Sequence, residues 1–507
     1  MTADYQLNNE FIKADTEKVA NEAGFALFGS FLGKGLFFLS QVIIARCLGL
    51  ECFGLYALGF TLVKICEILA RLGLNNGGMR FVSIYKDSNP AKLKAAVISA
   101  TGISLLNGML IGAILYFLSA NISTSIFHKP ELKEPLQLFA LGMPFIASMT
   151  VVSSLLRGFH TMKYTVYMRD VIQPAGNIIL IICFYLAGFE LPGVISAFIL
   201  SHLAALIIGF FYLNKLFPNF KARGIKANYE IKELILYSIP LLFVGFLHYL
   251  LLWTGTLMLG LLGSVKDVGI YRAASQLPSL MTIFLVATNS IYAPLAANLY
   301  QNGQMQRLSS IFKTTTRWVT YVTIPIFIFL VFSSKEVMMI FGKQYVENGF
   351  IVLIILSFGQ MVNCITGGVG CTLNMTGRQN LELISSLAMF ALNIILNLIL
   401  IPRYGVIGAA IASGLSIVII NFARVIIIKF CYGMHPFSSA LAMYLIPAII
   451  SSVLLFIINN RIEHLGLIAT MLLIFATFGI FFWKFHRLNA QDQLLINIFK
   501  NKLKYFG

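Results

Sequence analysis

Apolar stretches of about 20 residues recur along the whole chain and are separated by short polar connectors. A helix that crosses a bilayer needs such a length, because it must satisfy its own backbone polar groups inside the hydrocarbon. Charged residues make up 11% of the chain, whereas an ordinary globular chain has roughly 25%. The pattern predicts an all-α integral membrane protein and excludes disorder, nucleic-acid binding and a disulfide-rich secreted domain.

The apolar stretches predict about fourteen transmembrane helices, of which the seventh and eighth are long enough to tilt or bend at Pro240 and Pro278. Lys and Arg residues are concentrated in the N-terminal segment, the even-numbered connectors and the C-terminal tail, so both termini are predicted to be cytoplasmic. The formal charge of +17 is thereby explained mostly by topology. The predicted spans are 24–46, 52–71, 96–117, 135–156, 168–188, 193–214, 233–261, 268–297, 317–333, 349–371, 383–401, 405–427, 439–459 and 465–483.

Short motifs recur in the same order in the two halves of the chain, which predicts two six-helix repeats in parallel orientation around a central cavity, followed by two extra helices. The predicted divisions are an N-terminal segment 1–23, bundles 24–220 and 221–430, two helices within 431–484, and a cytoplasmic tail 485–507. The matched motifs are Gly54-Leu55-Tyr56 with Gly269-Ile270-Tyr271, Asn177-Ile178-Ile179-Leu180 with Asn393-Ile394-Ile395-Leu396, and Gly193-Val194-Ile195 with Gly405-Val406-Ile407.

Several of these motifs also carry a family resemblance. Together with the plan of six, six and two helices, the chain resembles bacterial polysaccharide flippases of the O-antigen and capsule type, in the multidrug/oligosaccharidyl-lipid/polysaccharide exporter superfamily. One departure is Thr254-Gly255-Thr256, where relatives often have Thr-Asp-Arg or Thr-Asp-Lys. The resembling motifs are Leu48-Gly49 before Gly54-Leu55-Tyr56, Gly73-Leu74 before Arg80-Phe81-Val82, Tyr237-Ser238-Ile239-Pro240, and Gly269-Ile270-Tyr271.

The resemblance implies a carrier, not an enzyme, that moves an undecaprenyl-pyrophosphate-linked oligosaccharide from the cytoplasmic to the periplasmic leaflet of the bacterial inner membrane by alternating access. The expected partners are that substrate and membrane lipids, and the polymerase and other polysaccharide-assembly proteins are candidates. We find no phosphate-binding loop for ATP, and the seven cysteines lack metal or redox spacing. No cofactor, metal or nucleic acid is therefore predicted, and coupling to a proton or sodium gradient stays open.

Basic residues inside apolar spans are candidates for binding an anionic diphosphate, because an unpaired charge in a membrane is costly and usually faces a wet cavity or a partner. Lys34 and Gln41 share a face of the first span, and His248 is the position equivalent to Lys34 in the second half. A snorkelling lysine and a packing histidine are the alternatives. The candidate substrate-binding residues are Lys34, Lys64, His248, Arg272, Gln41 and Gln276.

Glu67 and Asp170 are the acids that we place in or at the edge of a span, which makes them the ion-coupling candidates. Lys64, Glu67 and Arg71 lie on one helix face and could pair with each other. The equivalent positions of Lys64 and Glu67 in the second half, Ser279 and Thr282, are uncharged, which favours a cavity role. Gln360 and Asn363 are candidate sugar contacts, although a stripe of small and amide side chains also suits helix packing.

Two other functions remain open. A cation-coupled multidrug exporter of the same superfamily would favour acidic, aromatic-lined pockets, which the basic candidates argue against. A membrane-embedded polysaccharide polymerase or ligase would usually have a large external loop, and the longest predicted one, near 118–134, is too short.

Overall fold

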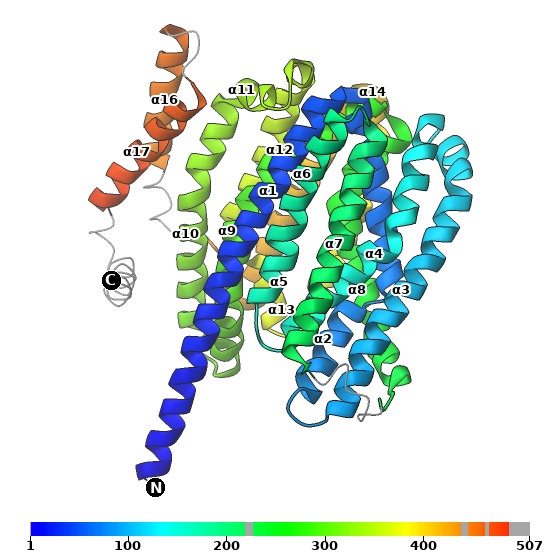
Figure 1. The fold of residues 1–507 in the computed structure, drawn as a ribbon. Helices are drawn as coiled ribbons and strands as arrows, with labels where there is room; N and C mark the ends of the chain where they lie inside the picture. The colour runs from blue at the N-terminus through cyan, green and yellow to red at the C-terminus, as the bar shows by residue number, and fades with distance from the viewer. Residues whose placement is uncertain (1, 219–226, 438–444, 462–465, 486–507) are drawn as a thin grey trace. The chain divides into compact units, whose positions relative to one another are not determined.

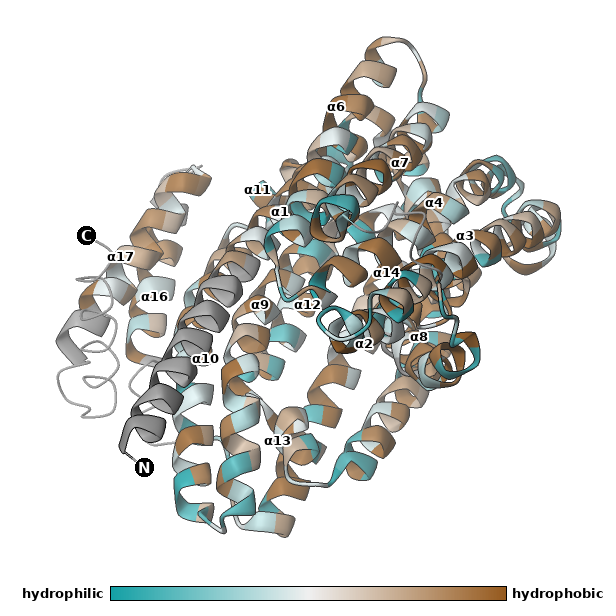
Figure 2. Cartoon of the chain, turned by 60° about the horizontal axis from the view of Figure 1, so that its bottom comes forward, coloured by the Kyte–Doolittle hydropathy of each residue, from teal (hydrophilic) through white to brown (hydrophobic). Residues whose placement is uncertain are grey.

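The computed structural model describes residues 2–218, 227–437, 445–461 and 466–485. Within these ranges the chain is helical, and its helices are joined by turns and short π and 3-10 helices (Figure 1). Nine of the described helices are long and apolar enough to cross a membrane, and a bent tenth also qualifies. Hydrophobic residues run along most of their length, and hydrophilic residues gather near the helix ends and connectors (Figure 2). The chain is a multi-pass membrane protein.

Two of these helices, α1 and α14, each contain two of the predicted spans. The number of long helices is therefore smaller than the number of predicted crossings. The helix α1 (Thr2–Arg71) has non-helical backbone at Gly49, with φ 75°, and α14 (Gln379–Tyr432) has it at Gly405, with φ 54°. Positive φ strains a residue that carries a Cβ, so glycine suits both breaks. The division into fourteen crossings stays a prediction.

The long predicted span at 233–261 corresponds to α8 (Ile231–Leu262), which bends by 44° between Ile231–Leu247 and Tyr249–Leu262. The bend therefore lies after Pro240, which α8 accommodates within its first segment. A proline inside a helix removes a backbone hydrogen bond and commonly causes a kink there, which is why the bend was expected at Pro240; the structure bends after Leu247 instead.

The chain forms two compact units, Met1–Gly269 and Ile270–Gly507. The first unit is built around α4 (Lys133–Gly158), which packs against α1, α2, α3 and α7. A core of Leu, Val, Met and Phe side chains fills the space between α2, α3, α4 and α7. Besides α1 and α8, the other helices of this unit are α2 (Leu74–Tyr85), α3 (Pro90–Asn121), η1 (Ile122–Ile126), η2 (Pro130–Leu132), α5 (Lys163–Thr165), η3 (Val166–Ile172), α6 (Gln173–Leu186) and α7 (Leu191–Leu216).

The second unit packs α12 (Val346–Thr366) against α10 (Met305–Phe332) and α14. The C-terminal helices α16 (Leu445–Arg461) and α17 (Leu467–Phe485) pack on α10, where Tyr321 donates a hydrogen bond of 2.8 Å to the carbonyl of Phe478. Its remaining helices include most of α9 (Val265–Gln301), α11 (Ser334–Met339) and α13 (Val369–Met375). The predicted tail, 485–507, lies almost entirely outside the described residues.

The glycines of the repeated Gly-x-Tyr motifs, Gly54 and Gly269, lie close to each other within the first unit. A Cβ added at Gly54 would overlap the carbonyl oxygen of Val265, and one added at Gly269 would lie 2.7 Å from the carbonyl oxygen of Leu50. Each motif thus needs glycine because the opposite backbone approaches it closely. The repeat-based bundles, 24–220 and 221–430, group the chain by similarity, whereas the two units group it by contact, and the repeat-based grouping stays a prediction.

Candidate functional site

A cavity of about 190 Å³ lies inside the first unit, among α1, α4, η3, α6 and α7. Aromatic rings line part of it, and amide, hydroxyl and basic groups line the rest. Carboxylates are absent from this set of described lining residues, so its charged groups are cationic. The lining residues are Phe37, Ser40, Phe60, Lys64, Met149, Thr150, Arg169, Gln173, Pro174, Asn177, Phe198 and His202.

Lys64 is the basic residue that α1 contributes to the cavity. Its ammonium nitrogen lies 2.6 Å from Glu67 Oε2 and 5.7 Å from the centre of the Phe60 ring. Glu67 is 3% exposed. Its Oε1 atom accepts a hydrogen bond of 2.7 Å from Thr150 and lies 3.8 Å from the Arg71 guanidinium. The stripe of Lys64, Glu67 and Arg71 therefore pairs internally, and Lys64 still borders the cavity.

Arg169 and Asp170 lie on a π-helical turn, η3, at the start of α6. Arg169 donates hydrogen bonds of 2.8 and 3.2 Å to the two carboxylate oxygens of Asp170. Asp170 is buried, whereas the Arg169 side chain is 45% exposed and lines the cavity. Isolated π turns often mark functional sites. Both predicted coupling acids, Glu67 and Asp170, are thus bound to a cation in this structure.

His202 and Asn177 complete the polar wall of the cavity. His202, on α7, is 5% exposed, and its ring lies 4.2 Å from that of Phe198. Sequence reasoning missed His202, although a histidine inside an apolar span is itself a signal of function. Asn177 is 4% exposed, and its Oδ1 atom has no hydrogen-bond partner among the described residues.

Lys34 and Gln41 lie on α1 but outside this cavity lining. Lys34 is exposed, and it lies close enough to Arg169 and Asp170 to interact with both electrostatically. Gln41 is 1% exposed. The structure therefore brings Lys34 near the cavity and places Gln41 in the helix packing of the first unit.

The remaining candidates divide between the two units. His248 lies on α8, but its side chain is outside the described part of the structure. In the second unit, Arg272 is half-buried on α9, and Gln276 is buried one turn further on. Asn363 donates a hydrogen bond of 3.2 Å to Gln360, so these predicted sugar contacts bind each other on α12.

The second unit also contains an acid inside a span that the sequence interpretation left out, because the predicted span began at 383. Glu382 lies in the first turn of α14. Its Oε1 accepts a hydrogen bond of 2.5 Å from Arg424, and Arg424 also donates to Ser386 at 3.0 Å. Glu67 and Asp170 are therefore not the only acids in or beside a span: α14 begins at Gln379, four residues before the predicted boundary, and so includes Glu382.

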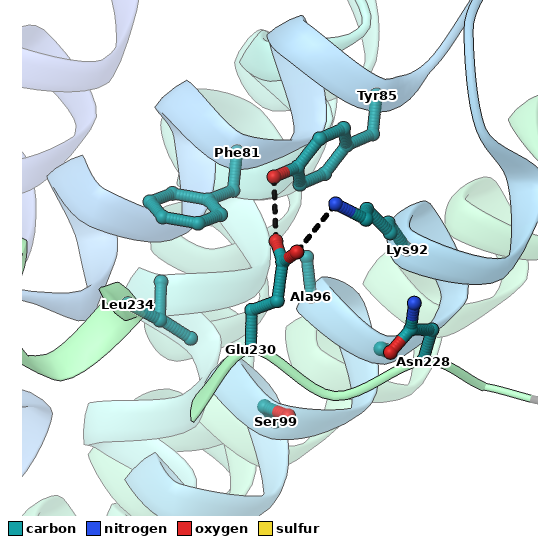
Figure 3. A pocket seen from close by; sticks show the side chains of 9 residues that line it. Phe81, Tyr85, Lys92, Ala96, Ser99, Asn228, Glu230 and Leu234 are labelled. Atoms are coloured by element: carbon teal, nitrogen blue, oxygen red, sulfur yellow. Dashed lines mark hydrogen bonds and ion pairs between the residues drawn. The ribbon is translucent and has the colours of Figure 1, made fainter. Parts of the chain in front are cut away.

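A third polar cluster holds the start of α8 against α2 and α3 (Figure 3). Glu230 accepts a hydrogen bond of 2.6 Å from the Tyr85 hydroxyl and forms an ion pair with Lys92. Lys92 and Tyr85 lower the pKa of Glu230, and the bond to Glu230 raises the pKa of Tyr85. The adjoining cavity of about 10 Å³ has room for roughly one water, so the cluster is a clasp and not a ligand site.

Two family models and several proteins of known name are similar to this chain. The family model described as "Polysaccharide biosynthesis protein" matches residues 19–299, and the MatE model matches residues 240–399. A protein of Haloferax volcanii named "Probable low-salt glycan biosynthesis flippase Agl15" is 24% identical, over 76% of this chain and 78% of its own length. The "Capsular polysaccharide biosynthesis protein CapF" of Staphylococcus aureus is 26% identical, over 59% of this chain and 77% of its own.

The fold is that of a solved flippase. The structure titled "Lipid II flippase MurJ, inward closed conformation" superimposes with a TM-score of 0.72 at 15% identity, and it covers 91% of this chain and 99% of that one. An inward-facing multidrug transporter of the MATE family has a TM-score of 0.68 at 16% identity, over 79% of this chain and 94% of its own.

Proposed function

Because the chain belongs to the family of polysaccharide biosynthesis proteins, we propose that it is a flippase for a lipid-linked oligosaccharide. The substrate is an undecaprenyl-pyrophosphate-linked unit that passes from the cytoplasmic to the periplasmic leaflet of a bacterial inner membrane, with both termini of the chain cytoplasmic. The unit serves surface polysaccharide assembly. The chain acts as a carrier and not as an enzyme.

The observation that carries this proposal is the cation-lined cavity of the first unit. A diphosphate that crosses a bilayer must replace its hydration with other donors, because an unpaired charge in hydrocarbon is costly. Lys64 and Arg169 supply charged donors on two walls, and Gln173 supplies an amide. Phe37, Phe60 and Phe198 supply apolar surface against which a sugar ring can pack.

Transport follows from exposing such a site to the two leaflets in turn. In the alternating-access scheme that we propose, the headgroup binds when the cavity is open to the cytoplasm and leaves when it opens to the periplasm. Lys34, Arg272, His248, Gln41 and Gln276 remain candidate contacts along that path. Arg169 already bonds Asp170, so it can reach a phosphate only by exchanging or sharing that partner.

The MatE match favours a second candidate, a cation-coupled drug exporter. A cationic drug would need an available carboxylate, whereas the described lining of the cavity is cationic and the nearby Glu67 and Asp170 are already paired. A drug-efflux assay separates the two candidates. An increase in drug resistance on expression, with no effect on surface glycan, would replace the flippase proposal with this one.

The direct test is to measure surface glycan in a host that lacks its own copy of this gene. Removing one charge-assisted hydrogen bond costs about 1.5–3 kcal/mol, so Lys34→Ala and Lys64→Ala are each expected to reduce export about tenfold or more. Lys266→Ala is the matched control, because its side chain is 60% exposed and lies outside the cavity. Wild-type glycan in both test variants, at equal protein levels in the membrane, would refute the cationic-cavity mechanism.

A further inference from the structure

His202 is the neutral titratable side chain that the first unit presents to its cavity. Its Nδ1 lies 2.8 Å from the carbonyl oxygen of Phe198, and the amide nitrogen of Gln173 lies 3.3 Å from the same atom. A carbonyl oxygen can only accept, so Nδ1 carries the hydrogen in this shorter contact. The Gln173 amide nitrogen is itself a donor, and its hydrogen bond goes to Ser201 Oγ at 3.2 Å and not to Nδ1. The other ring nitrogen, Nε2, is therefore the atom at which the imidazole can take up a proton.

The charged groups around His202 come from three elements. On α1, Lys64 is bound to Glu67 and Arg71 lies 3.8 Å from Glu67, while Lys34 interacts electrostatically with η3. On η3, Arg169 is bound to Asp170. On α4, Arg157 donates to Ser154 at 2.7 Å and interacts with Arg169 and Asp170. These described groups include more cations than carboxylates, and α6 adds only the neutral Gln173 and Asn177 to the lining.

A proton on Nε2 would add a positive charge to a cavity that is already cationic. That charge is favourable when an anion occupies the cavity, because the anion then lies near Lys64, Arg169 and the imidazolium together. Binding and protonation must strengthen each other equally, since the coupling free energy between two sites is reciprocal. An empty cavity therefore favours the neutral ring, and an anion-filled one favours the charged ring.

Asn177 adds an unpaired hydrogen-bond acceptor to this cavity. Its buried Oδ1 atom has no donor among the described residues, and unpaired buried acceptors are rare in native proteins. A hydroxyl group of a sugar, or a water that enters with it, would supply the missing donor. The cavity thus offers cationic groups for an anion and an acceptor for a neighbouring hydroxyl.

We propose that the cavity binds an anionic, oxygen-rich group and that His202 takes up one proton from solvent at Nε2 when it does so. The proton is released to solvent when the group leaves. The inference rests on the proposed function, in which that group is the diphosphate of the lipid-linked unit; an acidic sugar of the same unit has the same chemistry. Proton uptake would make substrate affinity, and with it the direction of transport, depend on the pH on each side of the membrane.

The test uses the full chain in lipid nanodiscs and two soluble probes whose own charge is constant between about pH 5 and 8. UDP-glucose carries a disubstituted diphosphate with a hexose, and glucuronate carries a carboxylate sugar. Calorimetry in two buffers of different ionisation enthalpy gives the number of protons taken up with each probe. The two probes distinguish a diphosphate source from an acidic-sugar source.

For the wild-type chain we expect uptake of up to one proton and an affinity that falls by up to about tenfold per pH unit as the pH rises. His202→Gln should bind with little pH dependence and near the wild-type affinity at the alkaline end. His160→Gln is the matched control, because His160 is exposed and lies outside the cavity, and it should keep the wild-type slope. His202→Asn, checked by thermal unfolding, serves if His202→Gln folds poorly.

The outcomes separate this inference from the function on which it rests. A pH slope that persists in a folded His202 variant, or binding by the wild type without proton uptake, overturns the role of His202 and leaves the flippase proposal standing. Failure of both probes to bind at any pH overturns the anion-binding cavity itself, and this inference with it.

Discussion

Lys64 donates a hydrogen bond of 2.6 Å to Glu67, which lies one turn further along α1 and is almost completely buried. The pair borders the cavity through Lys64 and contacts α4 through the bond from Thr150 to Glu67. A residue that a flippase would use to bind an anion is thereby held by an internal carboxylate. The Lys64–Glu67 bond therefore stabilises the empty protein. When Lys64 binds an anion, this bond has to break or be shared with the anion.

The first prediction concerns the cost of breaking this pair. Glu67→Gln should lower the free energy of unfolding by about 3 kcal/mol, because it leaves Lys64 and Arg71 without their carboxylate in a buried place. The double variant Lys64→Met/Glu67→Gln should recover most of that loss. Denaturant or thermal unfolding in one detergent measures both. A single variant as stable as the wild type would show that the pair is not structural.

The same two variants separate stability from transport. The double variant is expected to fold and insert while losing export of surface glycan, because it lacks the cavity cation. If the double variant exports normally, Lys64 has only a packing role. Changing the ion gradient across the membrane of cells that carry Glu67→Gln then tests coupling, since an unchanged response compared with the wild type would remove Glu67 as the coupling site.

A second prediction concerns Glu382 and Arg424 in the second unit. Arg424→Met removes the partner of a partly buried carboxylate and should destabilise the protein by about 3 kcal/mol, the lower end of the range for buried pairs. Lys429→Met is the control, because Lys429 lies on the same helix and is exposed. Equal thermal stability of the two variants would contradict a structural role for the ion pair.

The clasp at the start of α8 should respond to acid. Bonds from Lys92 and Tyr85 hold the pKa of Glu230 below its ordinary value of 4.5. A lowered pKa gives stability that is present above pH 4.5 and is lost as the pH falls through the folded-state value. Glu230→Gln should therefore lose less stability than the wild type when the pH falls below about 5, as measured by the free energy of unfolding at each pH. Identical acid profiles would show that Glu230 contributes nothing to stability.

The clasp should also weaken in strong alkali. The bond to Glu230 raises the pKa of Tyr85 above its ordinary value of 10.0. A raised pKa gives stability that is present below pH 10 and is lost as the pH rises through the folded-state value. Tyr85→Phe should remove this alkaline component, and the ultraviolet titration of tyrosinate in the wild type and in Tyr85→Phe measures it. A Tyr85 that titrates at its ordinary value would contradict the clasp geometry.

A further prediction tests the close approach of the repeated glycines. Gly54→Ala and Gly269→Ala should each destabilise the protein by about 1–3 kcal/mol, because the new methyl group overlaps a carbonyl oxygen or crowds it. Gly102→Ala is the control: its Cβ would meet nothing within 4 Å, and alanine favours the helix. Unfolding midpoints of the three variants give the comparison. Equal midpoints would mean that the backbones can move apart freely.

The sequence predicted much of the fold because the bilayer imposes one length on every crossing helix. A helix lies at most of the predicted spans, although 349–371 is divided between α12 and α13 and the first residues of 439–459 are outside the described chain. Helical spacing also places Lys64, Glu67 and Arg71 on one face, as the structure has them. The family was also predicted correctly, from short motifs. The positions of Gly49 and Gly405 as breaks within continuous helices were less evident, because glycine also occurs within regular helices.

The cavity could not be derived in the same way. The cavity depends on the π turn at η3, which positions Arg169 at its wall and Asp170 beside Arg169. Such a turn has no reliable sequence pattern. The cavity also depends on which face of α7 meets α1, and only packing decides that. His202 was therefore missed. Gln41, Gln360 and Asn363 were chosen from helical spacing; in the structure Gln41 is buried and Asn363 bonds Gln360, and their roles stay predictions.

The paired glycines have one consequence for the origin of the two halves. The predicted repeat aligns Gly54 with Gly269 and therefore Leu50 with Val265. Each glycine faces the carbonyl of the residue four positions before the other glycine. Such reciprocal contact is isologous, the kind that a two-fold symmetric homodimer makes. If the predicted repeat is correct, this self-complementary contact is the one through which two separate copies of a single bundle would associate.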